Sequence, residues 1–289
     1  MRLPDIPELF CPEFFCYSPN PLRVPMNYED LCSFVRGSQV FDLGVDLFPG
    51  MPHVPTHAPY GFTLNREHGD LMLPSGACSA VEAIFCTGHT GTHIDALSHY
   101  SMDMKLHGGI AVKDVQSKTE GMKAHGIETV APFVQRGVML DVTAHLDKEI
   151  LEGGFGIGPK ELEAVAEAQG VRIEAGDVVL VRTGQMQQWP GRNYYFQESG
   201  QPGVNIDGAR WLSGRGIRMV GTDTYCVEVR PEPASPVHVH MLVESGIHLL
   251  EIANLEELSR TKTYEFLFVA MPLKIRGGTG SPVRPVAIV

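Results

Sequence analysis

Four side chains that can bind a metal ion lie within eleven residues of the segment CTGHTGTHIDALSHY (residues 86–100). They are His89, His93, Asp95 and His99. Neutral imidazole nitrogen and carboxylate oxygen are the usual protein ligands of zinc, manganese and iron. The spacing H-x-x-x-H-x-D therefore predicts a metal site, in preference to ordinary polar loop residues or isolated core histidines.

The local sequence allows these side chains to converge. A turn at Gly91 can fold the chain back toward His89, and an extended segment from His93 to Asp95 places those two side chains on one face. The zinc-protease motif HExxH does not fit, because no glutamate follows His89 and the intervening Thr-Gly-Thr is a poor helix former. Nearby hydroxyl groups are predicted to support the ligands by hydrogen bonds; they belong to Thr87, Thr90 and Thr92.

A second segment, PVHVHMLVESGIHLLE (residues 236–251), offers further ligands. It contains His238, His240, His248 and Glu251. Because His248 and Glu251 are three positions apart in a predicted strand, they face opposite sides and at most one points into the site. A closed structural zinc site normally recruits cysteines, and Cys86 is the only cysteine near the first segment. The pattern therefore favours a catalytic metal site with an open coordination position.

The composition is that of a globular protein with a small-molecule partner. The chain has 289 residues, of which 43% are hydrophobic and 20% charged, and its formal net charge is −11. That charge argues against a nucleic-acid or membrane partner, because both require a basic face. The six scattered cysteines form no CxxC pair and indicate reduced thiols in a cytoplasmic protein. We expect neither a membrane span nor a signal peptide, since the required apolar runs are missing from the sequence.

Strands and helices alternate in the second half of the chain, which predicts an α/β fold with parallel strand pairing. Helices are predicted at residues 159–170, 207–216, 235–246 and 254–260. Strands are predicted at residues 79–86, 137–142, 177–183, 218–223 and 247–253, and within 264–275 and 282–289. Residues 51–76 are predicted to form a long loop. The glycine-rich GGFGIG (residues 153–158) lacks the order of a nucleotide-binding loop and is predicted to be a turn.

Two parts of the chain are distinguished. Residues 1–36 are predicted to form a proline-rich N-terminal arm followed by a short helix at residues 27–36, because six prolines fall in the first 25 residues. The arm either lies against the domain or a neighbouring subunit, or is a loosely ordered tail. Residues 37–289 are predicted to form one compact domain.

The first metal segment closely resembles the signature H-x-G-T-H-x-D-x-P-x-H of the cyclase family of metal-dependent hydrolases, which includes bacterial kynurenine formamidases and isatin hydrolases. FDLGVDLFPGMP (residues 41–52), GDVVLVRTG (176–184) and VGTDTYCVE (220–228) resemble other segments of that family. Leu97 stands where the signature has proline, which is expected to loosen the turn before His99. The chain is also considerably longer than a minimal formamidase.

The resemblance implies roles for individual residues. It makes His89, His93 and Asp95 metal ligands and His99 the catalytic acid/base. Glu251 and a histidine at the start of the preceding helix become the ligands of a second metal position. The leucine-rich sequence that follows favours His238 as that histidine, with His240 as the alternative.

The resemblance also implies a fold and an activity. The fold is a single compact α/β domain of the swivelling β/β/α type with a mixed sheet, assembled as a homodimer or homotetramer. The cofactor is Zn²⁺ or Mn²⁺, with one or two ions per chain. The activity is hydrolysis of a small amide, lactam, formamide or lactone, as in an arylformamidase or an isatin hydrolase. Candidates to line an aromatic-accepting pocket, with simple packing as the alternative, are Phe48, His53, His57, Phe62 and Trp189.

Physical chemistry supports hydrolysis independently. A divalent metal generates a nucleophilic hydroxide from water and polarises a carbonyl, while a nearby histidine transfers protons. One alternative is a non-haem iron oxygenase, because His93-x-Asp95 with a distant histidine also forms a facial triad. Such enzymes usually have all-β jelly-roll folds, whereas this chain alternates strands and helices, and His89 would have no role. A second alternative is a non-catalytic metal-binding protein, for which His99 would be dispensable.

Overall fold

The structure is a computed structural model that describes residues 28–195 and 199–289. It divides the chain into two units, Met1–Ser38 and Gln39–Val289. In the first unit, helix α1 (Tyr28–Gly37) forms where residues 27–36 were predicted to be helical. Acidic residues in its first turn and Arg36 in its last turn complement the helix dipole. The predicted proline-rich arm at residues 1–27 lies outside the described residues.

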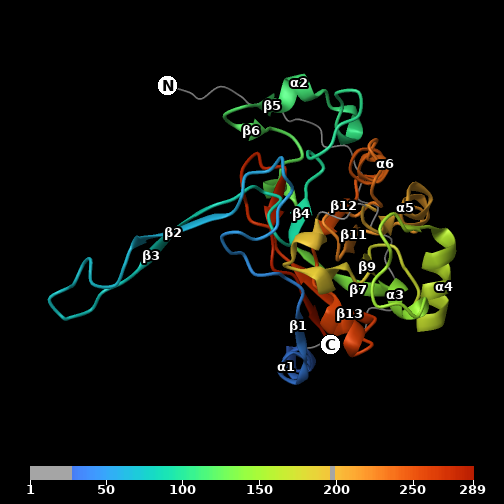
Figure 1. The fold of residues 1–289 in the computed structure, drawn as a ribbon, viewed down its shortest axis with the longest axis horizontal. Helices are drawn as coiled ribbons and strands as arrows, with labels where there is room; N and C mark the ends of the chain where they lie inside the picture. Colours follow the sequence, from blue (N-terminus) through green and yellow to red (C-terminus); the bar gives the residue numbers. More distant parts are fainter. Residues whose placement is uncertain (1–27, 196–198) are drawn as a thin grey trace. The chain divides into compact units, whose positions relative to one another are not determined.

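A nine-stranded mixed sheet forms the centre of the second unit (Figure 1). Strands β7, β9, β11 and β12 are parallel, and antiparallel strands flank them on both sides. The predicted α/β fold with a mixed sheet is confirmed. In spatial order the strands are β1 (Val40–Asp42), β15 (Val286–Ile288), β13 (Glu265–Ala270), β7 (Phe133–Asp141), β9 (Val178–Arg182), β11 (Met219–Thr222), β12 (His248–Glu251), β4 (His93–Asp95) and β14 (Gly280–Pro282).

The central strands are buried on both faces, as their continuous apolar sequences require. Alternate residues of each strand contribute to two hydrophobic cores: Val179 belongs to one and Leu180 to the other. Leu162 and Leu212, from two helices, lie in the same core as Val179. The helices of this unit are α2 (Val112–Val115), α3 (Val142–His145), α4 (Pro159–Gln169), α5 (Ile206–Ser213), α6 (Pro236–His238) and α7 (Glu256–Arg260).

Helix α4 begins and ends where the sequence predicts. Pro159 occupies the first turn, and the Glu161 carboxylate accepts a hydrogen bond from the backbone N–H of Gly158 at 3.0 Å. Gly170 ends the helix in the left-handed conformation, with φ of 69°. Shorter helical turns are η1 (His107–Gly109), η2 (Ile127–Thr129), η3 (Gln185–Gln188) and η4 (Arg192–Tyr194), and α6 continues as the π-helix η5 (Val239–Ser245).

The structure corrects the prediction of a long loop at residues 51–76. Strand β2 (Gly61–Arg66) lies within that range and pairs with β3 (Val81–Phe85) to form a hairpin. Three of the prolines that suggested a loop precede β2, and Pro74 lies at the tip of the hairpin. The hairpin projects away from the nine-stranded sheet (Figure 1). Two-stranded pairs also join β5 (Gln116–Ser117) to β6 (Gly121–Met122) and β8 (Gly156–Ile157) to β10 (Gly203–Val204).

Other predicted elements differ in length from those observed. Strand β7 is longer than the predicted strand at 137–142, and β13 and β15 occupy only parts of the last two apolar runs. The turn predicted within residues 153–158 is present, and β8 covers its last part. No helix within the described residues is long and apolar enough to cross a membrane.

Candidate active site

The pairing of β4 with β12 brings the two predicted metal segments together. In this antiparallel register His93 lies opposite Glu251, and Asp95 lies opposite Leu249. Because side chains alternate along a strand, His93, Asp95 and Glu251 share one face of the sheet, while Ile94 enters the core on the other. Nε2 of His93 lies 3.4 Å from Glu251 Oε2 and 3.6 Å from Asp95 Oδ1. The local strand geometry predicted for His93 and Asp95 is confirmed.

The turn before β4 positions His89. Gly91 has φ of 60°, and a Cβ atom there would lie 2.5 Å from the Leu47 side chain, so only glycine fits. The chain thus reverses and His89 Nδ1 lies 2.7 Å from Asp95 Oδ1. The other ring nitrogen of His89 is 3.0 Å from the Thr279 hydroxyl. His89 and Asp95 therefore converge as the sequence predicted.

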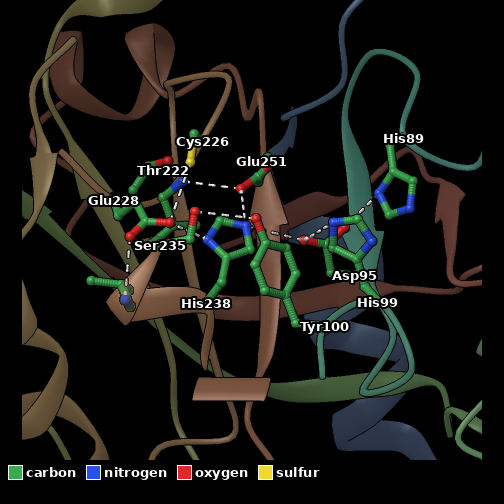
Figure 2. A network of polar contacts seen from close by, with 12 residues as sticks. His89, Asp95, His99, Tyr100, Thr222, Cys226, Glu228, Ser235, His238 and Glu251 are labelled. Carbon is green, nitrogen blue, oxygen red and sulfur yellow. Dashed lines mark hydrogen bonds and ion pairs between the residues drawn. The ribbon is translucent and has the colours of Figure 1, made fainter. Parts of the chain in front are cut away.

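His238, the last residue of the short helix α6, enters the site. Its Nδ1 donates to Glu228 Oε1 at 2.6 Å, which turns Nε2 toward Glu251 and Asp95. That Nε2 is 3.4 Å from Glu251 Oε1 and 3.8 Å from Asp95 Oδ2. Figure 2 shows His238 between the Glu228 side and the Asp95 side of this network.

The loop that follows β11 completes this side of the site. It brings Cys226 and Glu228 beside the end of β12, where Glu251 lies, because β11 and β12 are parallel neighbours. The backbone N–H of Val227 donates to Glu251 Oε1 at 3.0 Å. Ile252, directly after Glu251, is held at φ of 58°, a strained conformation for a β-branched residue.

Three groups of side chains have the donor atoms and spacing of a metal site. Within each group the ligand atoms lie within 4.8 Å of one another. Asp95 and Glu251 each belong to two groups, so each carboxylate can bridge neighbouring positions. Asp95 Oδ2 is buried and has no hydrogen-bond partner among the described residues, which fits a carboxylate oxygen arranged for a cation. The groups are His89/Asp95/His99, His93/Asp95/Glu251 and Cys226/His238/Glu251.

The electrostatics of the buried carboxylates agree with this arrangement. Burial acts to raise the pKa of Asp95, but the imidazoles of His99 and His89 outweigh it and hold that pKa well below its usual range. Burial and Asp95 likewise act to raise the pKa of Glu251, yet hydrogen bonds from His238 and His93 lower it to about 2. Both side chains are therefore ionised at neutral pH and are electron-pair donors.

His99 belongs to the first of these groups and lies beside Asp95 and His89. Its Nε2 is 4.0 Å from Asp95 Oδ2, its ring centroid is 4.0 Å from that of His89, and its side chain is 23% exposed. Burial lowers the pKa of His99 to about 4. The charge of Asp95 acts to raise this pKa, and the nearby His89 and His238 act to lower it. The imidazole is neutral at pH 7 and can accept a proton. The turn before it is closed, since His99 N–H donates to Ala96 O at 2.9 Å even though Leu97 replaces the signature proline.

The remaining candidate histidines lie outside these groups. His240 contacts Ser213 and Glu244, at 2.8 Å and 2.7 Å. His248 faces the opposite side of β12 from Glu251, as predicted, and its Nδ1 donates to the backbone oxygen of Asp95 at 2.9 Å. His238 is thus the histidine of this segment that the structure brings to the site.

The five residues predicted to line a pocket have different surroundings. His57 is near the site, with its ring centroid 5.7 Å from that of His89. His53 Nδ1 lies 2.9 Å from Val54 O, Phe62 is 48% exposed on the hairpin, and Trp189 contacts Tyr194. Phe48, in the segment before Gly50, is partly buried.

The three threonines do not bond to the ligand side chains as predicted; they bond to backbone groups or to each other. Thr92 instead donates to the backbone oxygen of Ile252 at 2.6 Å and accepts from Val45 N–H at 3.0 Å. Thr87 and Thr90 pair with each other at 3.0 Å. Thr92 therefore fixes β4 beside the end of β12, and supports the ligands through the backbone.

Several residues at the site were given no role by sequence reasoning. Cys226 and Glu228 belong to VGTDTYCVE, and Tyr100 directly follows His99, with its ring 4.5 Å from that of His238. Thr279 comes from the glycine-rich segment between β13 and β14. No local pattern marks any of the four.

Comparison with known proteins agrees with the geometry. A kynurenine formamidase of Bacillus cereus is 30% identical over 252 residues, which cover 87% of this chain and 98% of the relative. A crystal structure described as a novel cyclase superposes with a TM-score of 0.79 at 26% identity, covering 89% of this chain and 88% of the other. Isatin hydrolase A of Ralstonia solanacearum gives a TM-score of 0.71 at 27% identity, covering 94% and 99%. The family model described as putative cyclase matches residues 41–229, and this chain belongs to the cyclase family of metal-dependent hydrolases.

Proposed function

We propose that this metal-dependent hydrolase cleaves the C–N bond of a small aromatic formamide or lactam, with His99 as its acid/base and Asp95 and Glu251 at the centre of the metal site. One observation carries the proposal: both buried carboxylates face two groups of ligand atoms each, and Asp95 Oδ2 has no hydrogen-bond partner among the described residues. Such an arrangement fits cations and is unfavourable without them.

The proposed ligands are His89, His93 and Asp95 from the first segment and His238 and Glu251 from the second. A bound divalent ion lowers the pKa of water to about 7 and polarises a carbonyl oxygen. Hydrogen bonds at Nδ1 fix the two ligand imidazoles so that each Nε2 points into the site. His93 Nδ1 donates to the backbone oxygen of Gly91 at 2.8 Å, and His238 Nδ1 donates to Glu228.

His99 is the proposed proton carrier. As a neutral imidazole beside Asp95, it accepts a proton from the attacking water while the water oxygen bonds to the acyl carbon. It then delivers that proton to the leaving nitrogen as the C–N bond breaks. The ring of Tyr100, 5.0 Å from that of His99, limits the movement of the imidazole.

The substrate class is supported by relatives and by one contact. A relative is named kynurenine formamidase, and a structural neighbour is named isatin hydrolase A. His57, whose Nδ1 is buried without a hydrogen-bond partner among the described residues, lies beside His89 and is proposed to contact the substrate's polar group. We propose Zn²⁺ or Mn²⁺ as the metal, because imidazole and carboxylate suit both ions, and two positions because two carboxylates are shared between groups.

The test compares hydrolysis of N-formylkynurenine and of isatin by the wild type, His99→Ala and His240→Ala, with metal content measured in each. His99→Ala should keep its metal and lose about 100-fold or more in kcat. His240→Ala is the matched control. His240 lies on η5, outside the metal groups, and contacts Ser213, so this variant should keep the activity of the wild type. Full activity in His99→Ala, or a wild type that binds no metal, would contradict the proposal. Oxygen consumption with bound iron would indicate an oxygenase instead.

We also propose a homodimer or homotetramer located in a reducing cytoplasm. The β2–β3 hairpin supports self-association: within the described chain its two strands pair only with each other, and its side chains are largely apolar and exposed. The described cysteines are free thiols, which agrees with a reducing compartment; they are Cys32, Cys78, Cys86 and Cys226.

A further inference from the structure

We propose that the sulfur of Cys226 is a third protein ligand, together with His238 and Glu251, of the second metal position, and that this position therefore selects a thiophilic divalent ion such as Zn²⁺ over Mn²⁺. The inference rests on the proposed function, because it assumes that a metal binds at this site. It adds a ligand that lies outside the two metal segments, residues 86–100 and 236–251.

The geometry of Cys226 carries the inference. Its Sγ, a ring nitrogen of His238 and a carboxylate oxygen of Glu251 all lie within 4.8 Å of one another, and all three residues are buried. Two ligand atoms of one zinc ion are typically about 3.5 Å apart. The three side chains therefore need to move by only about 1 Å to enclose an ion.

The backbone of Cys226 is held in place. Its carbonyl oxygen accepts hydrogen bonds from Thr224 Oγ1 at 2.7 Å and from Gln201 Nε2 at 2.5 Å. The next residue, Val227, donates its N–H to Glu251 Oε1. Cys226 and Glu251 are thus joined by a short, fixed connection, and the sulfur is pre-positioned for an ion that Glu251 binds.

Burial raises the pKa of the Cys226 thiol to about 12, so its proton leaves only when a cation takes its place. Arg230 Nη2 donates to Cys226 Sγ at 3.1 Å, and its positive charge acts against the effect of burial. Glu228, 3.9 Å from that sulfur, fixes His238 with Nε2 facing the same point. When a divalent ion binds, the thiol proton is released to solvent and the sulfur–metal bond forms.

A thiolate changes which metal the position prefers. Imidazole and carboxylate accept zinc and manganese alike, whereas thiolate is a soft ligand that favours zinc and disfavours manganese. With Cys226, His238 and Glu251, the second position has one sulfur, one nitrogen and one oxygen donor. The group around His93 and Asp95 has only nitrogen and oxygen donors.

Cobalt substitution tests the inference in the full-length protein. The resident metal is removed by chelation, Co²⁺ is added, and bound cobalt is counted by elemental analysis while the absorption spectrum is recorded. A cobalt–thiolate bond produces an intense near-ultraviolet charge-transfer band that nitrogen and oxygen ligands do not produce. The wild type is compared with Cys226→Ser, which is nearly isosteric, and with Cys86→Ser, which removes a partly buried cysteine just before His89.

The inference expects the band in the wild type and in Cys86→Ser, and its loss in Cys226→Ser. It also expects zinc affinity in Cys226→Ser to fall by at least about tenfold, with a smaller change for Mn²⁺. Circular dichroism shows whether Cys226→Ser is folded; Cys226→Ala is used if it is not. Bound cobalt without the band, or a band unchanged in the folded Cys226 variant, would overturn the inference and leave the hydrolase proposal standing. Failure to bind any metal would overturn both.

Discussion

Buried carboxylates of this protein differ in whether their charge is compensated. Asp95 and Glu251 are surrounded by imidazoles and keep lowered pKa values. Asp223 is equally buried, but its Oδ1 accepts only from the Thr183 N–H and hydroxyl, at 2.8 Å and 2.7 Å, and its Oδ2 has no partner among the described residues. Burial raises the pKa of Asp223 to about 6. The same residue type is thus favourable at one position and costly at another, because the neighbours differ.

The variant Asp223→Asn tests this difference. The unfolded-state pKa of Asp223 is near 3.8 and the folded-state pKa is about 6, so the carboxylate removes stability as pH rises through the interval from about 4 to about 6. The variant keeps an oxygen for Thr183 and lacks the charge. We expect its free energy of unfolding to exceed that of the wild type by up to about 3 kcal/mol at pH 7, and the difference to vanish near pH 4.

Urea unfolding between pH 4 and 7.5 measures this effect. Asp207→Asn, at an exposed position on α5, is the control and should leave the pH dependence unchanged. A stability difference that does not vary with pH would show that the ionisation of Asp223 is not its source.

At the scale of elements, β4 depends on its two neighbours. Strand β12 supplies Glu251 opposite His93, and β14 supplies Gly280 opposite Asp95. The ring of His89 lies against Gly280, where a Cβ atom would be 2.6 Å from His89 Cε1 and 3.0 Å from the backbone oxygen of Ile94. The residue at this position of β14 must therefore be glycine for His89 to reach Asp95.

Gly280→Ala is expected to displace His89 while the sheet persists. The added methyl group meets an imidazole and a strand backbone, so we expect a loss of stability of about 1–3 kcal/mol and a fall in metal affinity of about 10-fold to 100-fold. Isothermal titration of the chelator-treated protein with Zn²⁺ measures the affinity. Gly37→Ala is the control, since a methyl group there meets no atom within 4 Å. Unaltered zinc binding in Gly280→Ala would refute a role for the β14 contact.

At the scale of the whole molecule, the β2–β3 hairpin is a separate two-stranded sheet whose apolar side chains do not belong to the two main hydrophobic cores. Phe62 and Ile84 face each other across it and are 48% and 57% exposed. The hairpin and its tip expose further apolar side chains; they are Leu64, Leu71, Met72, Leu73, Val81 and Phe85. Exposed apolar surface of this extent is typical of an interface.

The double variant Phe62→Glu/Ile84→Glu should weaken the proposed self-association. Losing two apolar contacts of about 1.5–3 kcal/mol each raises the dissociation constant by roughly 100-fold or more. Sedimentation velocity over a concentration series measures it. Met271→Glu, exposed but outside the hairpin, is the control and should assemble like the wild type. A wild type that remains monomeric at all concentrations would refute the proposed assembly.

The sequence by itself determined the features that depend on local spacing. His89, His93, Asp95 and His99 were identifiable because a turn and a three-residue strand are enough to bring most of them together. Helix α4 was predictable because proline and glycine mark its ends. The alternation of strands and helices likewise predicted the mixed α/β fold.

Only the tertiary structure decided the features that depend on strand register and loop approach. The choice of His238 over His240 depends on how α6 approaches Glu251. Strand β2 is not evident from the sequence because prolines precede it, proline and glycine follow it, and its partner β3 lies beyond the tip. Thr279 reaches His89 from a loop 190 residues away in sequence, and Cys226 lies beside His238 and Glu251 at the end of a loop after β11. No local pattern encodes such contacts, because they arise from the packing of whole elements around a common core.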